Sequence, residues 1–330
     1  MAELRTVLVD HGITLEEILD GTGFAPVDFH AEGRIPIRVA GAILDRAAAF
    51  TGRPDIGLLV GSRCDHRALG AMGDLMASAP TLRDALEDYI GLQMGYSRAA
   101  SVSLQRYGGD YAVAYGLYHG FPRGVRQVYD IAITVACAVL KSLTGGRVRA
   151  AKVLMSTRPP GDASSYLQAM GVLPQFDQEQ ACIVVREEDM ALPLPGANRE
   201  ARRILLDCIW SSLGAELSDP VARVRHALRP RLLVGEGDLA SIAGELGQHP
   251  RTLERNLARA GTTFGALRDE VRSAIARELL GQTDLPVGRI GEALSYGTHS
   301  AFVHAFNRWT GMSPSRWREV MPEAGTSINE

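Results

Sequence analysis

Two stretches near the C-terminus carry the same degenerate pattern. The first reads Leu239-Ala-Ser-Ile-Ala-Gly-Glu-Leu-Gly247 and continues with Arg251-Thr-Leu-Glu-Arg-Asn-Leu257. The second reads Val287-Gly-Arg-Ile-Gly-Glu-Ala-Leu-Ser-Tyr296 and continues with Ser300-Ala-Phe-Val-His-Ala-Phe306. In each copy, two short segments with apolar residues about every four positions flank a tight turn. This is the spacing of a helix-turn-helix, and two copies in tandem favour DNA as the partner.

The first copy contains the start and stop signals of both its helices. Asp238 is a good N-cap, and Gly247 is placed to end the helix that follows. Pro250 starts the second helix at a position where no hydrogen-bond donor is lost. Leu253 and Leu257 form the inner stripe of that helix. The outward positions, expected to face a major groove as in a recognition helix, are Arg251, Thr252, Glu254 and Arg255.

A longer amphipathic segment, residues 264–280, separates the two copies. Seventeen helical residues span about 25 Å, a suitable length for a strut between two DNA-reading modules. In the second copy we expect four aromatic residues to be core, namely Tyr296, Phe302, Phe306 and Trp309. The polar positions left to contact DNA are Ser300, His304, Asn307 and Arg308.

These residues carry a resemblance to a known family. The series Arg277-Glu-Leu-Leu280, Ile290, Tyr296, residues 300–309 and Thr310-Gly-Met-Ser-Pro314 resembles the signature of AraC/XylS regulators. The resemblance implies a seven-helix DNA-binding domain over about residues 232–320. It also implies bacterial transcription regulation, usually activation with RNA polymerase, and two recognition helices in successive major-groove segments of promoter DNA.

The sequence departs from the family pattern at five positions. Family members commonly carry Ser at His249, Glu at Arg289, Gly at Ser295, Arg at His304 and Lys at Asn307. The last two departures weaken or retune contacts of the second recognition helix. We therefore expect the arginines of the first recognition helix to carry more of the base reading than His304.

Composition limits the other classes of protein. The 330 residues carry a net charge of −3, and the chain from Asp219 onward is +1, so charge alone does not identify a DNA-binding protein. No stretch of about 18 apolar residues predicts a membrane span, and no leader is recognised, which favours a cytoplasmic location. Four dispersed cysteines fit reduced thiols better than a disulfide framework or zinc site: Cys64, Cys137, Cys182 and Cys208.

The sequence contains no recognisable enzyme motif. It lacks a phosphate-binding loop with lysine, an H-E-x-x-H pair, a nucleophilic serine elbow and clustered histidines. We therefore predict a protein that is not an enzyme and needs no metal or cofactor. The competing hypothesis is an effector-independent architectural DNA-binding protein. A large N-terminal region without surplus basic charge argues against that alternative.

The N-terminal two hundred residues predict a mixed α/β domain. Residues 37–50 read as an amphipathic helix, and Thr81 caps a second helix. The period then changes to two around Gly108-Gly109, which predicts a hairpin of residues 102–106 and 111–117. A long apolar helix over 124–143 follows. Further strands at 151–155 and 181–185 are expected on either side of a helix at 164–170.

This region resembles the N-terminal ligand-sensing domain of one AraC/XylS branch, without the β-rich opening of cupin-type members. The resemblance rests on Gly57-Leu-Leu-Val-Gly61, Leu69-Gly-Ala-Met-Gly73, residues 78–82, Phe176-Asp177 and Leu192-Pro-Leu194. It implies effector sensing and a homodimer. The expected organisation is a sensing and dimerisation domain at 1–200, a linker helix region at 201–231, a DNA-binding domain with two helix-turn-helix motifs joined by a long helix at 232–321, and a tail at 322–330.

Two places are candidates for the effector. The hairpin face with Tyr111 and Tyr115 could line a pocket, although a sheet packed on the 124–143 helix needs such an apolar face anyway. Arg199 and Arg203, with Arg202 between them, resemble the Arg-x-x-x-Arg pair with which PilZ-type proteins hold a cyclic dinucleotide such as c-di-GMP. The accompanying Asp/Asn-x-Ser-x-x-Gly motif is missing. Amino acids and other small metabolites are the broader class of expected effector.

Overall fold

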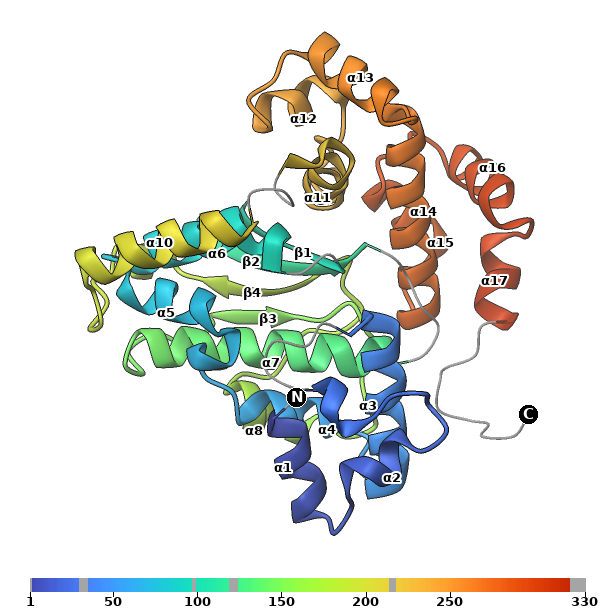
Figure 1. Cartoon of the computed structure of the whole chain (residues 1–330). Coiled ribbons are helices and arrows are strands. Elements are labelled where there is room, and N and C mark those ends of the chain that lie inside the picture. Colours follow the sequence, from blue (N-terminus) through green and yellow to red (C-terminus); the bar gives the residue numbers. More distant parts are fainter. Residues whose placement is uncertain (1, 30–34, 97–98, 119–123, 214–217, 321–330) are drawn as a thin grey trace.

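The computed structural model describes residues 2–29, 35–96, 99–118, 124–213 and 218–320. The expected tail at 322–330 lies outside these ranges. Two domains with separate hydrophobic cores make up the described chain. The N-terminal domain combines helices with one small antiparallel sheet, and the C-terminal domain is helical, as predicted (Figure 1). Within the described ranges, no helix is both long and apolar enough to span a bilayer.

The N-terminal domain begins with helices, continues through a hairpin and then alternates strands with helices. Its strands are β1 (Ala100–Tyr107), β2 (Asp110–Leu117), β3 (Lys152–Leu154) and β4 (Ala181–Val185). Its helices are α1 (Ala2–Asp10), α2 (Leu15–Leu19), the 3₁₀ turn η1 (Pro26–Phe29), α3 (Ile37–Thr51), α4 (Ile56–Ser62), the 3₁₀ turn η2 (His66–Leu69), α5 (Ala71–Ser78), α6 (Leu82–Tyr96), α7 (Val125–Leu143), α8 (Ser164–Met170), α9 (Glu187–Met190) and α10 (Arg199–Leu213).

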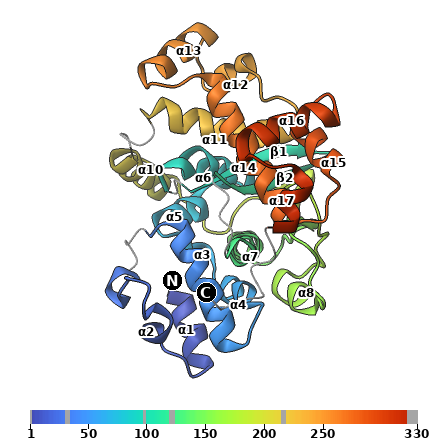
Figure 2. The ribbon, with the colours of Figure 1, turned by 90° about the vertical axis from the view of Figure 1, so that its right-hand side faces the viewer.

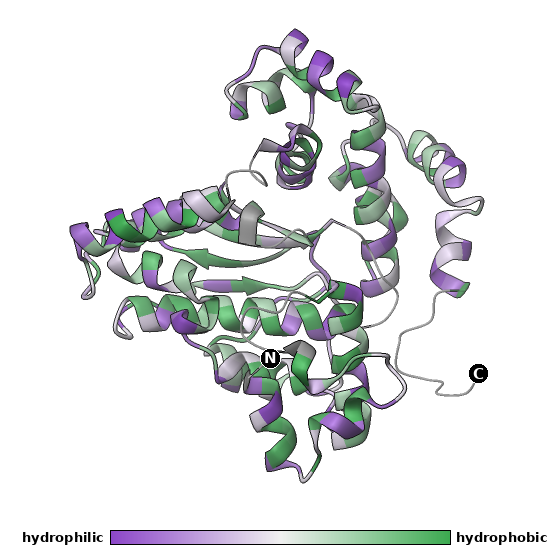
Figure 3. Ribbon diagram, viewed as in Figure 1, coloured by the Kyte–Doolittle hydropathy of each residue, from purple (hydrophilic) through white to green (hydrophobic). Residues whose placement is uncertain are grey.

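The sheet has the strand order β1-β2-β4-β3, with antiparallel neighbours throughout. The predicted hairpin is confirmed: Val102 pairs with Tyr115, and Gly108 takes a positive φ of 61° at the turn. The predicted strand at 151–155 is shorter in the structure, where β3 comprises three residues. Figure 3 shows the strands largely in the colours of hydrophobic residues, as expected for a sheet at the centre of the domain.

Helix α7 packs along one face of the sheet and is covered on its other side by α4 (Figure 2). The Gly57-x-x-x-Gly61 stretch explains this close packing. A Cβ atom added at Gly57 would lie 2.7 Å from the carbonyl oxygen of Gln127, and one at Gly61 would lie 2.7 Å from Cβ of Thr134. Real Cβ atoms do not approach so closely, so the two glycines are needed for α4 to pack against α7.

The C-terminal domain contains seven helices among its described residues. They are α11 (Pro220–Leu233), α12 (Leu239–Glu245), α13 (Pro250–Arg259), α14 (Phe264–Gln282), α15 (Val287–Ala293), α16 (His299–Thr310) and α17 (Pro314–Val320). Helices α12 and α13 form the first helix-turn-helix, α15 and α16 form the second, and α14 joins them. Buried residues of all these motifs share one core with α11, including Leu253, Ile275 and Phe302.

The 201–231 segment, expected as a linker, comprises most of α10 and α11. Helix α10 packs on α5 in the N-terminal domain, where Ile209 joins a small cluster with Leu75 and Leu92. Helix α11 belongs to the C-terminal core through Val224 and Leu228, both fully buried. We therefore place the boundary between the domains in the connection from α10 to α11.

Candidate nucleic-acid interface and the contact between domains

The first helix-turn-helix is formed by local signals that are visible in the sequence. The Asp238 carboxylate accepts hydrogen bonds from the amides of Ala240 and Ser241 at 2.9 and 3.0 Å, which caps α12. Gly247 ends the turn with a φ of 64°. The imidazole of His249 accepts a hydrogen bond from the Arg251 amide at 3.2 Å, so this residue caps α13 as the serine usual in the family would.

Helix α13 presents a polar face to solvent. Leu253 and Leu257 are fully buried, which fixes the rotation of the helix on its core. Arg251, Glu254 and Arg255 are exposed and Thr252 is half-buried, so all four predicted residues lie on the outer side. In the described chain, neither Arg251 nor Arg255 is held by a carboxylate from another element. Both guanidiniums are therefore available to phosphate or base edges.

The second helix-turn-helix is built on an aromatic cluster. Phe302 and Phe306 are fully buried, and Tyr296 and Trp309 pack against them at ring-centroid distances of 5.6 and 6.5 Å. The Thr298 hydroxyl caps α16 by accepting a hydrogen bond from the Ala301 amide at 3.1 Å. The four predicted polar residues are all exposed on α16: Ser300, His304, Asn307 and Arg308.

Arg308 differs from the arginines of α13 because it already has a partner. Its guanidinium lies 3.0 Å from the Asp269 carboxylate of α14, and both side chains are more than one third exposed. An exposed pair of this kind contributes little free energy, so a DNA phosphate could replace the carboxylate. In Figure 1, α13 and α16 both lie on the outside of the molecule, away from the N-terminal domain.

A buried ion pair of the C-terminal domain lies at the contact between the two domains. The Arg229 guanidinium on α11 donates to both carboxylate oxygens of Glu278 on α14, at 2.9 and 3.0 Å. The Tyr129 hydroxyl, from α7 of the N-terminal domain, donates to the same carboxylate at 2.6 Å. Burial disfavours the charge on Arg229, but the adjacent carboxylate and phenol raise its pKa overall. The Arg229 guanidinium therefore stays charged inside the interface.

A glycine of the sheet makes room for this ion pair. A Cβ atom at Gly116 on β2 would lie 1.9 Å from Nε of Arg229, so only glycine lets the guanidinium cross the strand. Nearby, the Tyr118 hydroxyl is hydrogen-bonded to Nδ1 of His226 on α11. Burial lowers the pKa of His226 to about 4. The imidazole is therefore neutral in the docked arrangement at neutral pH.

The hairpin face is packed in the core. Tyr115 lies against the ring of Tyr129 on α7 at a centroid distance of 5.6 Å, and burial raises its pKa. The guanidiniums of Arg83 and Arg106 both lie over the Tyr111 ring, at 4.5 and 4.4 Å from its centroid. At Tyr115 the structure thus uses this face for packing against α7, one of the two interpretations that the sequence left open.

The arginines predicted for a cyclic dinucleotide lie on α10. Together with Glu200 and Leu206, they line a shallow surface hollow of about 400 Å³. Arg202 forms two hydrogen bonds of 2.8 Å with Asp88 of α6. Arg203 is paired within its own helix, with Glu200 at 2.7 Å and Asp207 at 3.2 Å. A ligand at Arg203 would have to displace these carboxylates.

Sequence reasoning missed the contact between the domains. Arg229, Glu278 and Tyr129 are far apart in the chain, and nothing in the local sequence of the two charged residues shows that they are buried. Gly116 was the one available signal, because a glycine inside a strand often marks the close approach of another group. Within the described residues, no group of three or more His, Cys, Asp or Glu side chains is placed to hold a metal ion.

Comparison with known proteins agrees with this geometry. Residues 242–319 match a helix-turn-helix domain, and residues 12–194 match the family described as the arabinose-binding domain of AraC transcription regulators, N-terminal. Proteins with this arrangement are helix-turn-helix transcription regulators. The chain belongs to the AraC family.

Similar proteins include regulators of related length. The ornithine utilization regulator of Pseudomonas aeruginosa is 26% identical over 96% of this chain and 94% of its own. The HTH-type transcriptional regulator VirS of Mycobacterium tuberculosis is 27% identical over 84% of this chain and 82% of its own. The crystal structure of the regulator CdpR from P. aeruginosa aligns over 92% of this chain and 96% of its own, with 23% identity and a TM-score of 0.45.

Proposed function

We propose that the protein is a sequence-specific transcription activator that reads promoter DNA with α13 and α16 under the control of a small effector. The observation that carries this proposal is the exposed polar face of α13, where Arg251 and Arg255 have no carboxylate partner from another element in the described chain. Arg can pair with the O6 and N7 acceptors of guanine, and such contacts specify sequence.

In this proposal, Arg251, Thr252, Glu254 and Arg255 form the first reading head, and Ser300, His304, Asn307 and Arg308 form the second. Genomic fragments selected on the purified protein and then footprinted would test it. Protection of two major-groove segments about one helical turn apart, on one face of the duplex, is expected. Failure to enrich any fragment would reject the regulator and leave the architectural alternative.

The effector that we propose first is an amino acid or a similar small metabolite. The N-terminal match to a domain described as arabinose-binding supports a small ligand, and one relative is named for ornithine utilization. A cyclic dinucleotide at Arg199, Arg202 and Arg203 is the second candidate, and it must compete with the ion pairs of α10. Calorimetry with panels of amino acids and cyclic dinucleotides separates the two. Tyr111 and Tyr115 would contribute by holding the sheet rather than by contacting the ligand.

We further propose a homodimer that acts in the cytoplasm and engages RNA polymerase, on the basis of family membership. Sedimentation of the full chain with and without DNA tests the dimer, and a monomer in both conditions would reject it. We propose no enzymatic activity, because the relatives are named as regulators.

A further inference from the structure

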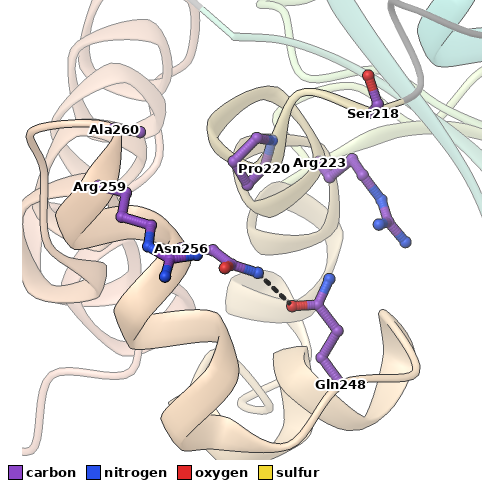
Figure 4. A pocket seen from close by; sticks show the side chains of 7 residues that line it. All are labelled: Ser218, Pro220, Arg223, Gln248, Asn256, Arg259 and Ala260. Carbon is purple, nitrogen blue, oxygen red and sulfur yellow. Dashed lines mark hydrogen bonds between the residues drawn. The ribbon is translucent and has the colours of Figure 1, made fainter.

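A hollow of about 410 Å³ opens between α11 and the first recognition helix. Figure 4 shows Arg223 of α11 and Arg259 of α13 on its walls, with Gln248 and Asn256 between them. The side-chain amide nitrogen of Asn256 donates to the side-chain oxygen Oε1 of Gln248 at 3.3 Å. The side-chain NH₂ group of Gln248 is then left facing the hollow as a donor. Lining residues therefore supply two guanidiniums and an amide donor.

The charge of this hollow favours an anion. Its lining contains no carboxylate, whereas most arginines elsewhere in the described chain pair with one. The Arg223 guanidinium makes only a long contact of 3.4 Å to the Leu246 carbonyl oxygen. Arg259 is exposed near the end of α13 and forms no ion pair with another described residue. Two unpaired guanidiniums beside a free amide match the oxygens of a phosphate group.

The position of the hollow identifies the source of the phosphate. Asn256 and Arg259 belong to the same helix as Arg255, on the flank that turns from the outer face toward α11. When a recognition helix enters a major groove, the sugar-phosphate backbones run along its flanks. We propose that this hollow binds a backbone phosphate of the DNA read by α13, and that Arg223 and Arg259 set the register of the first head. This proposal rests on the proposed DNA-binding function.

Salt dependence gives a direct test. Affinities for a duplex selected by the wild-type protein and for a scrambled duplex are measured over a range of salt concentrations. Arg223→Ala and Arg259→Ala should each lower the affinity for both duplexes by the same factor. Each should also reduce the slope of log affinity against log salt by about 0.9. Arg5→Ala on α1, far from α13, is the control and should change neither. Thermal unfolding of each variant verifies that the fold is kept.

Unchanged salt slopes in both variants would overturn the assignment. If the wild-type protein then binds inorganic phosphate and Arg223→Ala abolishes that binding, the hollow belongs to a free phosphate-bearing metabolite. Failure of the proposed function is distinguishable, because the wild-type protein would then bind selected and scrambled duplexes equally.

An independent observation concerns the C-terminal end of α14. The last carbonyl groups of a helix have no partners within it. Here the N-terminal domain supplies partners for two of them: the Arg158 side chain donates to the Gly281 carbonyl oxygen at 2.7 Å, and the Arg158 backbone amide donates to the Gln282 carbonyl oxygen at 2.7 Å. The Arg158 side chain also donates to the carbonyl oxygen of Thr283, the C-cap residue, at 3.2 Å. The Arg158 guanidinium also pairs with Asp284 at 2.7 Å.

The segment around Phe176-Asp177 completes this contact. The Asp177 carboxylate accepts a hydrogen bond from the Asp284 amide at 2.8 Å, and Phe176 is anchored edge-on against Tyr166 of α8 at 5.1 Å. Glu179 then reaches Arg289 on α15 at 2.6 Å. Arg289 stands where the family commonly carries glutamate, so this ion pair depends on a departure from the family pattern.

The geometry points to a clamp with which the N-terminal domain controls the second reading head. The clamp consists of Arg158, Asp177 and Glu179, and it holds the end of α14 together with the first helix of the second motif. The first motif is not touched by these residues. A change in the N-terminal domain would therefore shift the second head relative to the first. This proposal also rests on the proposed DNA-binding function.

Operator spacing tests the clamp. The selected duplex is compared with one that has a single base pair inserted between the two footprinted segments. The insertion increases the distance between these segments by about 3.4 Å. The wild-type protein should discriminate strongly against the insertion. In the variant with Arg158→Ala and Glu179→Ala, the ratio of the two affinities should fall toward one, and amides of residues 283–294 should exchange faster with solvent. Arg63→Ala, which breaks a pair with Asp10 in the N-terminal domain, is the control.

Retention of the wild-type ratio and exchange protection in the double variant would overturn the clamp. A charge reversal adds a second criterion. Arg289→Glu should reduce the discrimination between the selected duplex and the duplex with the insertion, and the further change Glu179→Arg should restore that discrimination. Lack of restoration would show that the Glu179–Arg289 ion pair does not contribute to the clamp. Absence of sequence-specific binding by the wild-type protein would instead reject the proposed function.

Discussion

The Arg229 guanidinium on α11 and the Glu278 carboxylate on α14 form an ion pair at 2.9 Å that is almost inaccessible to solvent, with side chains 6% and 2% exposed. Both residues belong to the C-terminal domain, and the Tyr129 hydroxyl of the N-terminal domain binds the same carboxylate. Because buried charges are costly when unpaired, Arg229 and Glu278 can be buried under α7 only as a pair.

Removal of one partner should destabilise the protein strongly. We expect Glu278→Ala to lower the free energy of unfolding by about 3–5 kcal/mol, because Arg229 would stay buried without its counter-charge. Urea unfolding measures the change. Glu270→Ala is the matched control, since it breaks a half-buried pair with Arg225 between the same two helices, leaves Arg225 within reach of solvent and should cost less than Glu278→Ala. Equal stability of Glu278→Ala and wild type would show that the pair is not buried in solution.

The docking of the domains can also be disturbed by a substitution in the N-terminal domain. Gly116→Ala places a methyl group where Arg229 lies and should separate the domains while each retains its fold. Small-angle scattering would report this as a larger radius of gyration. An unchanged radius would contradict the close packing of Arg229 on β2.

Acid should weaken the same interface through His226. Burial lowers the pKa of its imidazole from 6.5 to about 4. Between these values the unfolded or undocked state binds a proton that the docked state does not, so stability falls as pH decreases from about 6.5 to 4 and gains nothing further above 6.5. The full shift corresponds to at most about 3 kcal/mol. His226→Gln should flatten the profile in this window, and an identical profile for both proteins would refute the assignment.

Ser295 should be a site of backbone strain. It ends the helix α15 with a φ of 62°, a left-handed conformation that favours glycine, and the family commonly carries glycine there. We expect Ser295→Gly to stabilise the protein by about 0.5–1 kcal/mol, since the relief of strain exceeds the loss of a 3.3 Å hydrogen bond to the Leu232 carbonyl oxygen. A lower melting temperature for Ser295→Gly would show that the hydrogen bond dominates.

The two reading heads should differ in importance. Arg255→Ala should cost about 1–3 kcal/mol of binding to the selected duplex and relax the preference at one base pair, because Arg255 is free to contact guanine. His304→Ala should cost less, because an imidazole offers fewer hydrogen-bonding groups to a base edge than a guanidinium. Anisotropy titrations of both variants decide the order, and a larger loss for His304→Ala would move the main reader to α16.

Local signals in the sequence predicted the elements and the reading heads. Asp238, Gly247 and the stripe of Leu253 and Leu257 determine how α12 and α13 fold, whatever the rest of the chain does. The contact between the domains could not be predicted in this way. Whether Arg229 is solvated or buried depends on the position of Gly116 and Tyr129, and a chain so rich in arginine gives no local sign of which arginine is buried.

In the candidate effector regions, too, local sequence predicted the elements, whereas the packing between elements could not be predicted. The alternating pattern around Tyr115 predicted a strand with one apolar face, but only the packing of α7 determines that this face is filled. The spacing of Arg199 and Arg203 predicted a common helix face, and α10 confirms that they share a helix. The ion pairs of Arg203 with Glu200 and Asp207 arise from neighbours three and four residues away on the same helix. A comparison of motifs that considers only the two arginines does not predict these pairs.

The most direct test of the central claim is a comparison of two duplexes of equal length and composition, one selected by the protein and one scrambled, titrated at physiological and at high salt. We expect the selected duplex to bind at least about a thousandfold more tightly at physiological salt, with both affinities falling steeply as salt rises. Equal affinity for the two duplexes would contradict the claim that α13 and α16 read sequence.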